Sequence, residues 1–525
     1  MCWQKRILLF FVSVFSFSFL NAQTTASEKK KLEIIKADRY NFQKKDTAGD
    51  FLSLAGNVLL KQEKTLFYCD SAVLNQKENI VEAFGHIHIN DADSVHTYAE
   101  YVKYLGNDKK AFLKKNVRLT DGKGTLTTNE LEYETEAKIG IYKNGGKVVN
   151  NKTVLISKEG TYYGETKDVY FTTKVNLTNP EYKVTTDTLL YNIDTEIATF
   201  VTATNIKNGK RKIFTKDGFY DLKNKKAFFG KRPIIEDSTS TIIADNIAFE
   251  DSSGYAEAAG NVVYKDTAQG FVILSNNLKS NNKKGSILAT QKPLLIIKQE
   301  TDSIYIAADT LFSAKVKQDS SAFKKDTLKG KVLITKPDST LRYFEAYYNV
   351  RIFSDSVQAI ADSLCFSGID SVFKLFKNPI IWNQDNQIIG DTVYLFTKNQ
   401  KPQLLKVWEN ALAINKVNAK FYNQLRSNIL FAYFSNENID SVRAKGSAEN
   451  VYYAIDEENK FIAVNKSEAD VIDMYFKEKK PKKIVFLNNL KGKTTPIHKA
   501  NPEALQLKGF QWLENKRPKS KTDLF

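Results

Sequence analysis

One short pattern recurs along most of this chain at intervals of roughly 30 residues, and it limits the folds that the chain can adopt. The first half of the pattern is a turn residue followed by a short alternating strand, as in Gly56–Leu60. The second half is an apolar pair, an acidic residue and another β-rich run, as in Leu66–Leu74. The acidic residue returns at Asp70, Glu100, Glu130, Asp187, Asp217, Asp245, Asp309, Asp362 and Asp391. A fixed period of this size indicates stacked supersecondary units, each in contact mainly with its neighbours.

Short antiparallel β-strands are the expected building blocks of these units. Apolar and polar residues alternate in many short runs, for example Ile87 and Ile89 against His86 and His88. This alternation is the signature of a strand with one buried face. The chain also holds eighteen Asp-Ser or Asp-Thr steps, which favour turns and strand ends because their side chains bond to nearby backbone. We therefore predict an all-β, elongated fold built from repeats of about 30 residues.

The pattern also suggests how the chain is divided. Residues 1–22 contain the basic pair Lys5-Arg6 and an apolar run too short to span a membrane comfortably, which predicts a signal peptide cleaved after Ala22. We therefore expect an exported, soluble mature protein. Four segments are expected after the signal peptide. Regular β repeats occupy residues 37–312 and a polar insertion or seam occupies residues 313–342. A second β block with longer units occupies residues 343–500, and a basic C-terminal tail occupies residues 501–525.

The charge indicates the kind of partner, and the cysteines indicate whether a disulfide forms. The formal net charge is +17, and the stretch Phe476–Phe525 alone holds thirteen Lys or Arg against four Asp or Glu. Such a balance favours an anionic partner, or else reflects a lysine-rich solvated tail. Export argues against nucleic acid as that partner. Cys69 and Cys365 are expected to be free, buried thiols, because a bridge would require distant repeats to touch.

A search for catalytic chemistry finds little. The sequence holds no Gly-x-Ser-x-Gly elbow, no His-Glu-x-x-His and no Cys-x-x-Cys motif. The one metal-like group consists of His86, His88, His96, Asp91 and Asp93. Its histidines occupy the outward half of an alternating strand, where solvated side chains are expected, and a closed metal site needs four ligands. We predict no catalytic residues, no metal and no cofactor, so the protein is not expected to be an enzyme.

The combined pattern is similar to a known family. A signal peptide, units near 30 residues, Gly-Asn-Val strand starts and Asp-Ser steps together resemble the OstA-like (LptA-like) proteins, which carry lipopolysaccharide across the periplasm. The resemblance is sharpest at Ala37–Leu74, Tyr343–Ser356 and Trp512–Pro518. It implies a β-jellyroll folded as an open V, with an apolar groove for acyl chains. It also implies ends that stack on other jellyroll proteins to bridge the inner and outer membranes.

The inward residues of the alternating strands are then the candidate ligand-binding residues. Each lipid CH₂ that they bury is worth about 0.8 kcal/mol. By alternation they are Val58, Leu60, Ile87, Ile89, Val117, Leu119, Val262, Tyr264, Val332, Ile334, Val350 and Ile352. The resemblance implies a periplasmic protein and leaves open whether it associates with the outer membrane. It implies two kinds of partner: lipopolysaccharide or a related glycolipid, and other jellyroll proteins bound end to end. Nucleic acid is not expected, nor is an integral membrane protein.

Two other interpretations stay open from the sequence. In the first, the same inward residues close on one another as the core of an exported β-solenoid, which acts as a scaffold or adhesin without lipid cargo. In the second, the chain is a carbohydrate-active enzyme on a parallel β-helix. That enzyme would need carboxylates clustered on one strand face, and no repeat stands out by having them. The sequence leaves open whether the interior is a groove or a filled core.

Overall fold

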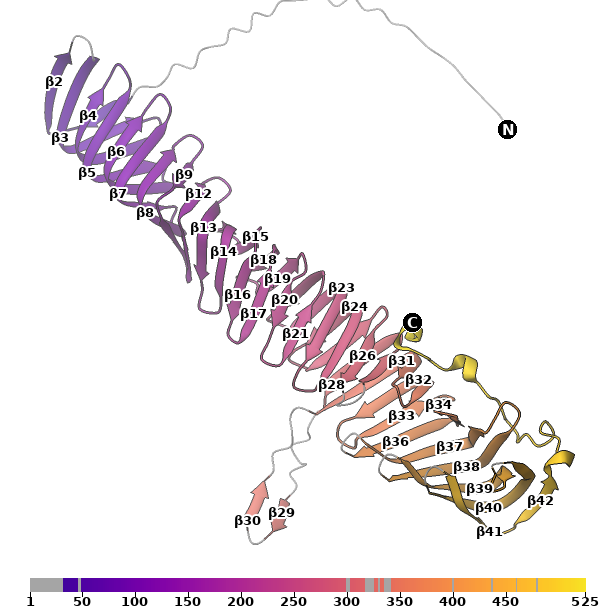
Figure 1. Cartoon of the computed structure of the whole chain (residues 1–525). Helices are drawn as coiled ribbons and strands as arrows, with labels where there is room; N and C mark the ends of the chain where they lie inside the picture. The colour runs from indigo at the N-terminus through magenta and orange to yellow at the C-terminus, as the bar shows by residue number, and fades with distance from the viewer. Residues whose placement is uncertain are drawn as a thin grey trace, which may run out of the picture. The chain divides into compact units, whose positions relative to one another are not determined.

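The structure, a computed structural model, describes residues 32–45, 49–298, 303–316, 325–328, 331–334, 341–398, 401–435, 438–458, 460–477 and 480–525. These residues form β-strands almost throughout, with three short 3-10 helices near the C-terminal end (Figure 1). The strands described below pair antiparallel with their neighbours. The all-β prediction is thus confirmed, and the parallel β-helix is wrong. The signal peptide predicted for residues 1–22 lies outside the described residues.

The described chain divides into two compact units. The first contains the residues up to Gly122 together with Asn129–Lys138, and the second contains Lys123–Thr128 and Ile139–Phe525. Strand β8 (Gly124–Glu134) contributes to both. The other strands of the first unit are β1 (Glu33–Lys36), β2 (Arg39–Lys45), β3 (Gly49–Gln62), β4 (Thr65–Asn75), β5 (Ile80–Asp91), β6 (Val95–Leu105) and β7 (Lys110–Thr120).

The second unit holds the remaining elements. Its first strands are β9 (Ile139–Tyr142), β10 (Gly146–Asn150), β11 (Thr153–Ser157), β12 (Glu159–Tyr163), β13 (Asp168–Thr178), β14 (Lys183–Asn192), β15 (Ile197–Phe200), β16 (Thr204–Asn208), β17 (Arg211–Thr215), β18 (Asp217–Asp221), β19 (Lys226–Gly230), β20 (Ile234–Glu236), β21 (Ser240–Ile243), β22 (Asn246–Glu250), β23 (Tyr255–Asp266), β24 (Phe271–Asn281), β25 (Ser286–Thr290), β26 (Leu294–Lys298), β27 (Ser303–Ala307) and β28 (Thr310–Lys315). They are followed by β29 (Lys325–Leu328), β30 (Lys331–Ile334), β31 (Arg342–Phe353), β32 (Gln358–Ser367), β33 (Val372–Phe376), β34 (Ile380–Asn383), β35 (Asn386–Ile389), β36 (Thr392–Lys398), β37 (Lys401–Lys416), β38 (Tyr422–Ser435), β39 (Asn438–Ile455), β40 (Phe461–Lys477), β41 (Lys480–Leu487), β42 (Lys491–Pro496), η1 (Ile497–Lys499), η2 (Glu514–Lys516) and η3 (Lys521–Leu524).

A β-bulge near the middle of every second long strand, as in β3, β5 and β7, folds the sheet into two faces. In β3, Gly56 and Asn57 have φ values of +80° and +45°, and the pairing with β4 skips from Ala55 to Val58. Extra residues in the left-handed conformation are what bend a bulged strand. The half of β3 before the bulge pairs with β2, and the half after it pairs with β1. We call the line of bulges the corner, and the opposite margin, where strand ends of the two faces meet, the mouth.

The repeated acidic residues belong to this corner. The side chain of Asn57 donates a hydrogen bond to Asp38 at 2.8 Å, and a Cβ at Gly56 would lie 2.5 Å from the same carboxylate oxygen. Equivalent corner pairs are Asp70–His86 and Glu100–Asn116 in the first unit, and Asp245–Asn261, Asp309–Asn349, Asp362–Lys377, Asp391–Asn410 and Asp470–Asn489 in the second. The two halves of the sequence pattern thus meet between neighbouring strands. The expectation that Asp70 marks a strand end is wrong, because it lies in the middle of β4.

Two segments of the second unit are not part of the folded sheet. Strands β29 and β30 pair only with each other and form a separate two-stranded sheet. Residues 497–525, which we call the C-terminal strap, cross the outer side of the sheet and are held by three glutamines. Each glutamine side chain accepts a hydrogen bond of 2.8 Å from the strap. The pairs are Gln424 of β38 with the Leu507 amide, Gln387 of β35 with the Leu513 amide, and Gln358 of β32 with the Arg517 guanidinium. Among the described residues, no helix combines the length and apolarity that crossing a membrane requires.

Candidate functional site

The inner side of the folded sheet carries the apolar residues that alternation predicts. In the first unit, six of them are between 1 and 3% exposed: Val58, Leu60, Ile87, Ile89, Val117 and Leu119. In the second unit, Val262 and Val350 are equally buried, whereas Tyr264 and Ile352 are half-buried and pack against the core. Val332 and Ile334 belong to β30, outside the folded sheet, and their side chains lie outside the described part of the structure. A role in ligand binding remains a prediction for all twelve.

In the first unit, buried tyrosines join the two faces across the mouth. The Tyr104 hydroxyl donates to the side chain of Gln62, and the Tyr133 hydroxyl donates to Asp91 at 3.3 Å. Both acceptors are about 5% exposed. Burial raises the pKa of Tyr104 to about 12, so its hydroxyl stays protonated and can donate. These contacts close the mouth with a polar bond that is itself shielded from water.

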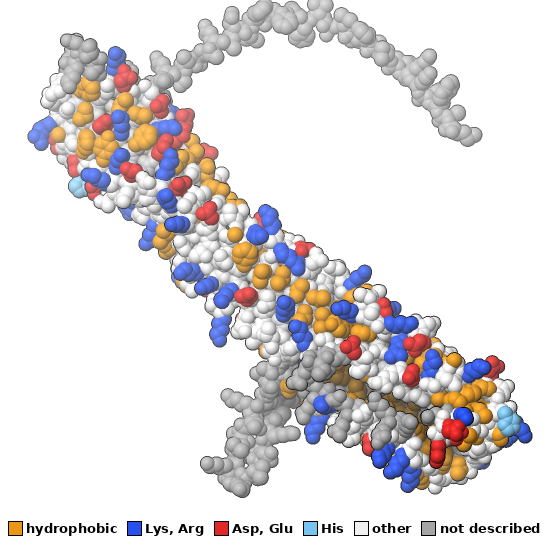
Figure 2. Space-filling view, viewed as in Figure 1, with side chains coloured by type: hydrophobic (Ala, Val, Ile, Leu, Met, Phe, Trp, Pro, Cys, Tyr) orange, Lys and Arg blue, Asp and Glu red, His pale blue; other side chains and the backbone are white. Residues whose placement is uncertain are grey.

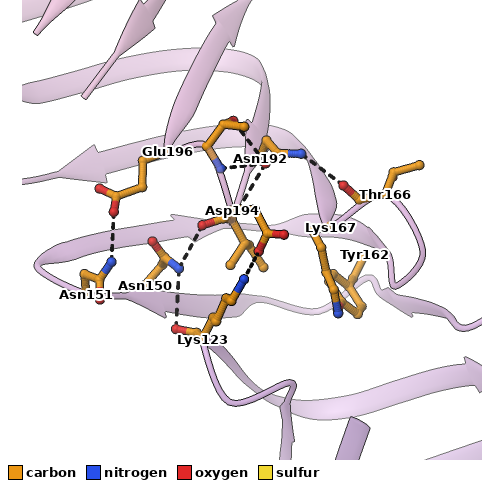
Figure 3. Close-up of polar contacts among 11 residues, drawn as sticks. Lys123, Asn150, Asn151, Tyr162, Thr166, Lys167, Asn192, Asp194 and Glu196 are labelled. Carbon is orange, nitrogen blue, oxygen red and sulfur yellow. Dashed lines mark hydrogen bonds and ion pairs between the residues drawn. The ribbon is translucent and has the colours of Figure 1, made fainter. Parts of the chain in front are cut away.

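The second unit begins with a mouth closed in the same way (Figure 3). Lys123 pairs with Asp194 at 2.9 Å, and the side chain of Asn151 donates to Glu196 at 2.9 Å. Beneath these exposed contacts, the side chain of Asn150 donates to the carbonyl of Ile193 at 3.3 Å and accepts from Tyr191. The strand ends of the two faces are therefore tied together directly.

Further along the second unit, the contact across the mouth is made by a charged group, the carboxylate of Asp251. The carboxylate of Asp251 accepts from Tyr182 at 2.6 Å, from Tyr220 at 2.8 Å and from Arg211 at 3.0 Å. Desolvation and the hydrogen bond to Asp251 raise the pKa of Tyr182 well above its ordinary range. We call the part of the second unit from β10 to β22 the closed section. Its interior is filled by Phe171, Leu189, Phe200 and Phe229, all fully buried.

The sequence contained a signal for these contacts that the prediction missed. Tyrosine recurs at steps of 29 residues, at Tyr104, Tyr133, Tyr162, Tyr191 and Tyr220. All five are buried, and the hydroxyls of Tyr104, Tyr133, Tyr191 and Tyr220 bond to side chains that come from other strand ends. An interval that repeats this strictly indicates one structural position per repeat.

The interior of the last strands, β31 to β41, is more accessible, and we call this part the C-terminal block. Six inward side chains near the mouth are only half-buried: Phe344, Phe366, Phe373, Leu395, Phe434 and Phe476. We call them the apolar row. Phe366 contacts Phe373 with ring centroids 4.3 Å apart. The pairs Tyr433-Phe434 and Tyr475-Phe476 lie 42 residues apart in the sequence. In each pair the Phe points inward, whereas the Tyr is about 40% exposed on the outside.

A small cavity lies beside the start of the apolar row. Its volume is about 10 Å³, roughly the room for one water molecule. Its lining comprises Ile273, Leu295, Ile306, Leu311, Phe312, Ser313, Phe344, Glu345, Ala346 and Leu364. The lining is almost wholly apolar, and the cavity is too small for an acyl chain unless side chains around it, such as Phe344, move aside.

The histidine group of the first unit is divided between two places. His86 bonds to Asp70 at 2.7 Å in the corner, and this contact raises its pKa. The His88 and His96 rings meet at 3.1 Å between their nitrogens, stacked beside Tyr98. Within the described residues, no three His, Cys, Asp or Glu side chains come together as a metal site.

The two cysteines are free. Cys69 in the first unit is buried, and Cys365 in the second is half-buried. Burial raises the pKa of the Cys69 thiol to about 12, which leaves it an inert apolar side chain. The predicted free thiols are confirmed, although Cys365 is less buried than expected.

Comparisons with known proteins address part of the chain. Residues 29–187 match the family described as OstA-like protein, and no curated protein matches. Among solved structures, a similar chain is LptH from Pseudomonas aeruginosa, described as the LptA homologous periplasmic component of the conserved lipopolysaccharide transport device. The identity is 13%, the match covers 31% of this chain and 80% of that chain, and the TM-score is 0.14. A score this low carries no argument about the fold, which rests on the strand pairings above. The comparisons thus show that residues 29–187 are similar to the OstA-like proteins.

Proposed function

We propose that this chain is a periplasmic protein of the lipopolysaccharide-transport type, which holds acyl chains in its apolar interior and performs no catalytic step. The observation that carries the proposal is the OstA-like match of residues 29–187, a stretch built from strands with one apolar inner side. Apolar surface removed from water stabilises a bound acyl chain by about 0.8 kcal/mol per CH₂. A uniform interior of this kind lets a chain move along it without one dominant site.

The apolar row is where an acyl chain can be taken up with the smallest rearrangement. Its side chains are half-buried and pack against a core rather than inside it. Val58, Ile89 and Val262, by contrast, are at most about 1% exposed. These residues would contact lipid only after the two faces separate at the mouth, which costs the cross-mouth hydrogen bonds.

The free edges of the sheet support end-to-end assembly with other jellyroll proteins. Within the part of the first unit that is described, β1 and β2 pair only with β3. They expose Ile35, Tyr40 and Phe42, each more than 50% accessible. Unpaired backbone groups flanked by apolar side chains are a template for strand addition. In the second unit, β41 and β42 likewise pair only with β40 among the described residues.

The surface charges suit an anionic headgroup without a single strong site for it. Figure 2 shows Lys and Arg interspersed with Asp and Glu on the viewed face, rather than gathered into one patch. The net charge of +17 nevertheless attracts an anionic lipid over the whole surface.

Site-specific photocrosslinking in the periplasm tests the proposal. A photoreactive residue at Phe366 is expected to capture lipopolysaccharide strongly, and residues at Ile89 and Val262 more weakly. His88 and Arg118, which point outward, serve as matched controls and are expected to capture none. If inward and outward positions behave alike, the protein is not a lipid carrier. That outcome favours the β-solenoid scaffold, for which the filled closed section is the supporting observation.

A further inference from the structure

One buried arginine in the second unit forms no ion pair with any described residue. Arg342 begins β31 and is 6% exposed, and no other Lys or Arg among the described residues is buried to this degree. A buried guanidinium ordinarily forms an ion pair, because burying an unpaired charge is costly. Within the described residues, Arg342 forms no ion pair and its Nη1 atom donates no hydrogen bond. Its charge is therefore balanced only at longer range, by the carboxylate of Asp266, and Nη1 has no protein acceptor among the described residues.

The remaining nitrogens hold the guanidinium in a fixed orientation. Nε donates to the hydroxyl of Ser313 at 3.0 Å, and Nη2 donates to the carbonyl of Gly285 at 2.9 Å. Burial lowers the pKa of Arg342 while nearby Asp266 opposes that change, and an arginine keeps its charge in either case. The two Nη1 hydrogens are left for a ligand.

The position of Arg342 in the fold places this charge beside the apolar interior. It sits at the mouth end of its face, and Asp266 ends β23 on the opposite face. Phe344, two residues further along β31, is the first member of the apolar row. The small cavity is lined by both Ser313, which holds Nε, and Phe344. A buried positive charge thus adjoins an apolar path, which is the arrangement that an anionic amphiphile requires.

We propose that Arg342 anchors the phosphate of a phosphorylated amphiphile whose acyl chains lie along the apolar row. This inference rests on the proposed function and specifies the headgroup that the interior selects. Arginine is suited to the role because its guanidinium makes charge-assisted hydrogen bonds to phosphate oxygens. Bonds of this class are worth tenfold or more in affinity.

Binding of lipid A and of dephosphorylated lipid A with the same acyl chains tests the proposal. The full-length protein is expected to bind the phosphorylated form at least tenfold more tightly. In Arg342→Gln, this preference is expected to fall below about twofold while the affinity for the dephosphorylated form is unchanged. Arg342→Lys keeps the charge and is expected to retain part of the preference. Arg351→Gln, an exposed arginine on the same strand, is the control and leaves both affinities unchanged.

Several results would contradict the proposal that Arg342 binds the phosphate. If Arg342→Gln weakens both ligands equally, the arginine only supports the fold, and circular dichroism of the variant checks this directly. If the preference persists in the variant, the phosphate binds elsewhere. If inorganic phosphate competes as well as lipid A, the site is an anion site that does not select amphiphiles. If the unaltered protein binds neither lipid form, the proposed function itself fails, which is a different result from losing the preference alone.

Discussion

The closed section and the C-terminal block of the second unit share their strand pairing but differ in how their interiors are filled. Both are antiparallel sheets, and corner pairs such as Asp362–Lys377 and Asp391–Asn410 recur in the C-terminal block. In the closed section, Phe200 and Phe229 are fully buried, whereas Phe366 and Phe434 are half-buried. The corner therefore sets the architecture, and the contacts at the mouth decide whether the interior is filled or accessible. The same repeated strand pairing thus has fully buried interior side chains in the closed section and half-buried ones in the apolar row.

The largest effect is expected from truncating an interior phenylalanine in each region. Phe200→Ala should cost about 3–5 kcal/mol, because it leaves a cavity in a filled core. Phe366→Ala should cost only about 1 kcal/mol, because the side chain is half-exposed already. Amide hydrogen exchange on β15, which holds Phe200, and on β32, which holds Phe366, measures the local opening free energy in the full-length protein. Equal costs would show that the C-terminal block is as tightly filled as the closed section.

A smaller effect is expected from the buried mouth contact at Asp251. Asp251→Asn removes the charge that binds Arg211 and two tyrosine hydroxyls, and should cost about 2–3 kcal/mol. Asp221→Asn is the control, since among the described residues the Asp221 side chain accepts hydrogen bonds from Asn224 of the same hairpin and from no other residue. Hydrogen exchange of β17 and β22 reports the change. If the two substitutions cost the same, the buried contact does not hold the mouth closed.

The smallest effect is expected from the exposed mouth contact between Lys123 and Asp194. Their side chains are 64% and 41% exposed, and exposed ion pairs contribute little. Asp194→Asn should change the opening free energy of β14 and β15 by at most about 0.5 kcal/mol, and even less at 1 M salt. A loss as large as that from Asp251→Asn would mean that the mouth is held by its surface charges.

Much of the strand pattern could be read from the sequence because alternation is a local property. Val58 and Leu60 fall on the inner side since successive side chains point to opposite faces. The Gly56-Asn57 step was harder, because left-handed residues serve both hairpin turns and bulges. Only the three-dimensional neighbours show that this step is a bulge: Asp38, between β1 and β2, and the pairing of β3 with β4.

The accessibility of the interior could not be read in the same way. The spacing between the two faces depends on contacts such as Tyr182 with Asp251, which are 69 residues apart. The residues next to Phe366 in the sequence carry no information about the spacing between the two faces. The same limit explains why residues 501–525 were predicted only as a basic tail: Leu507 and Leu524 are 3% exposed, but the glutamines that hold the strap lie on strands far back in the chain.

The C-terminal strap also bears on the order in which the chain can fold. Strand pairs and corner pairs join neighbouring segments, so they can form as soon as each repeat is available, with little entropy lost in closing a loop. Strap contacts join residues such as Arg517 and Gln358, 159 positions apart, and Arg351 and Asp523, 172 apart. They require residues that follow the last strand, β42, so they form after the strand pairs that they join. A molecule that lacks Arg517 and the residues after it can complete its earlier repeats and still lack these long-range contacts, so the strap reports whether distant strands are joined.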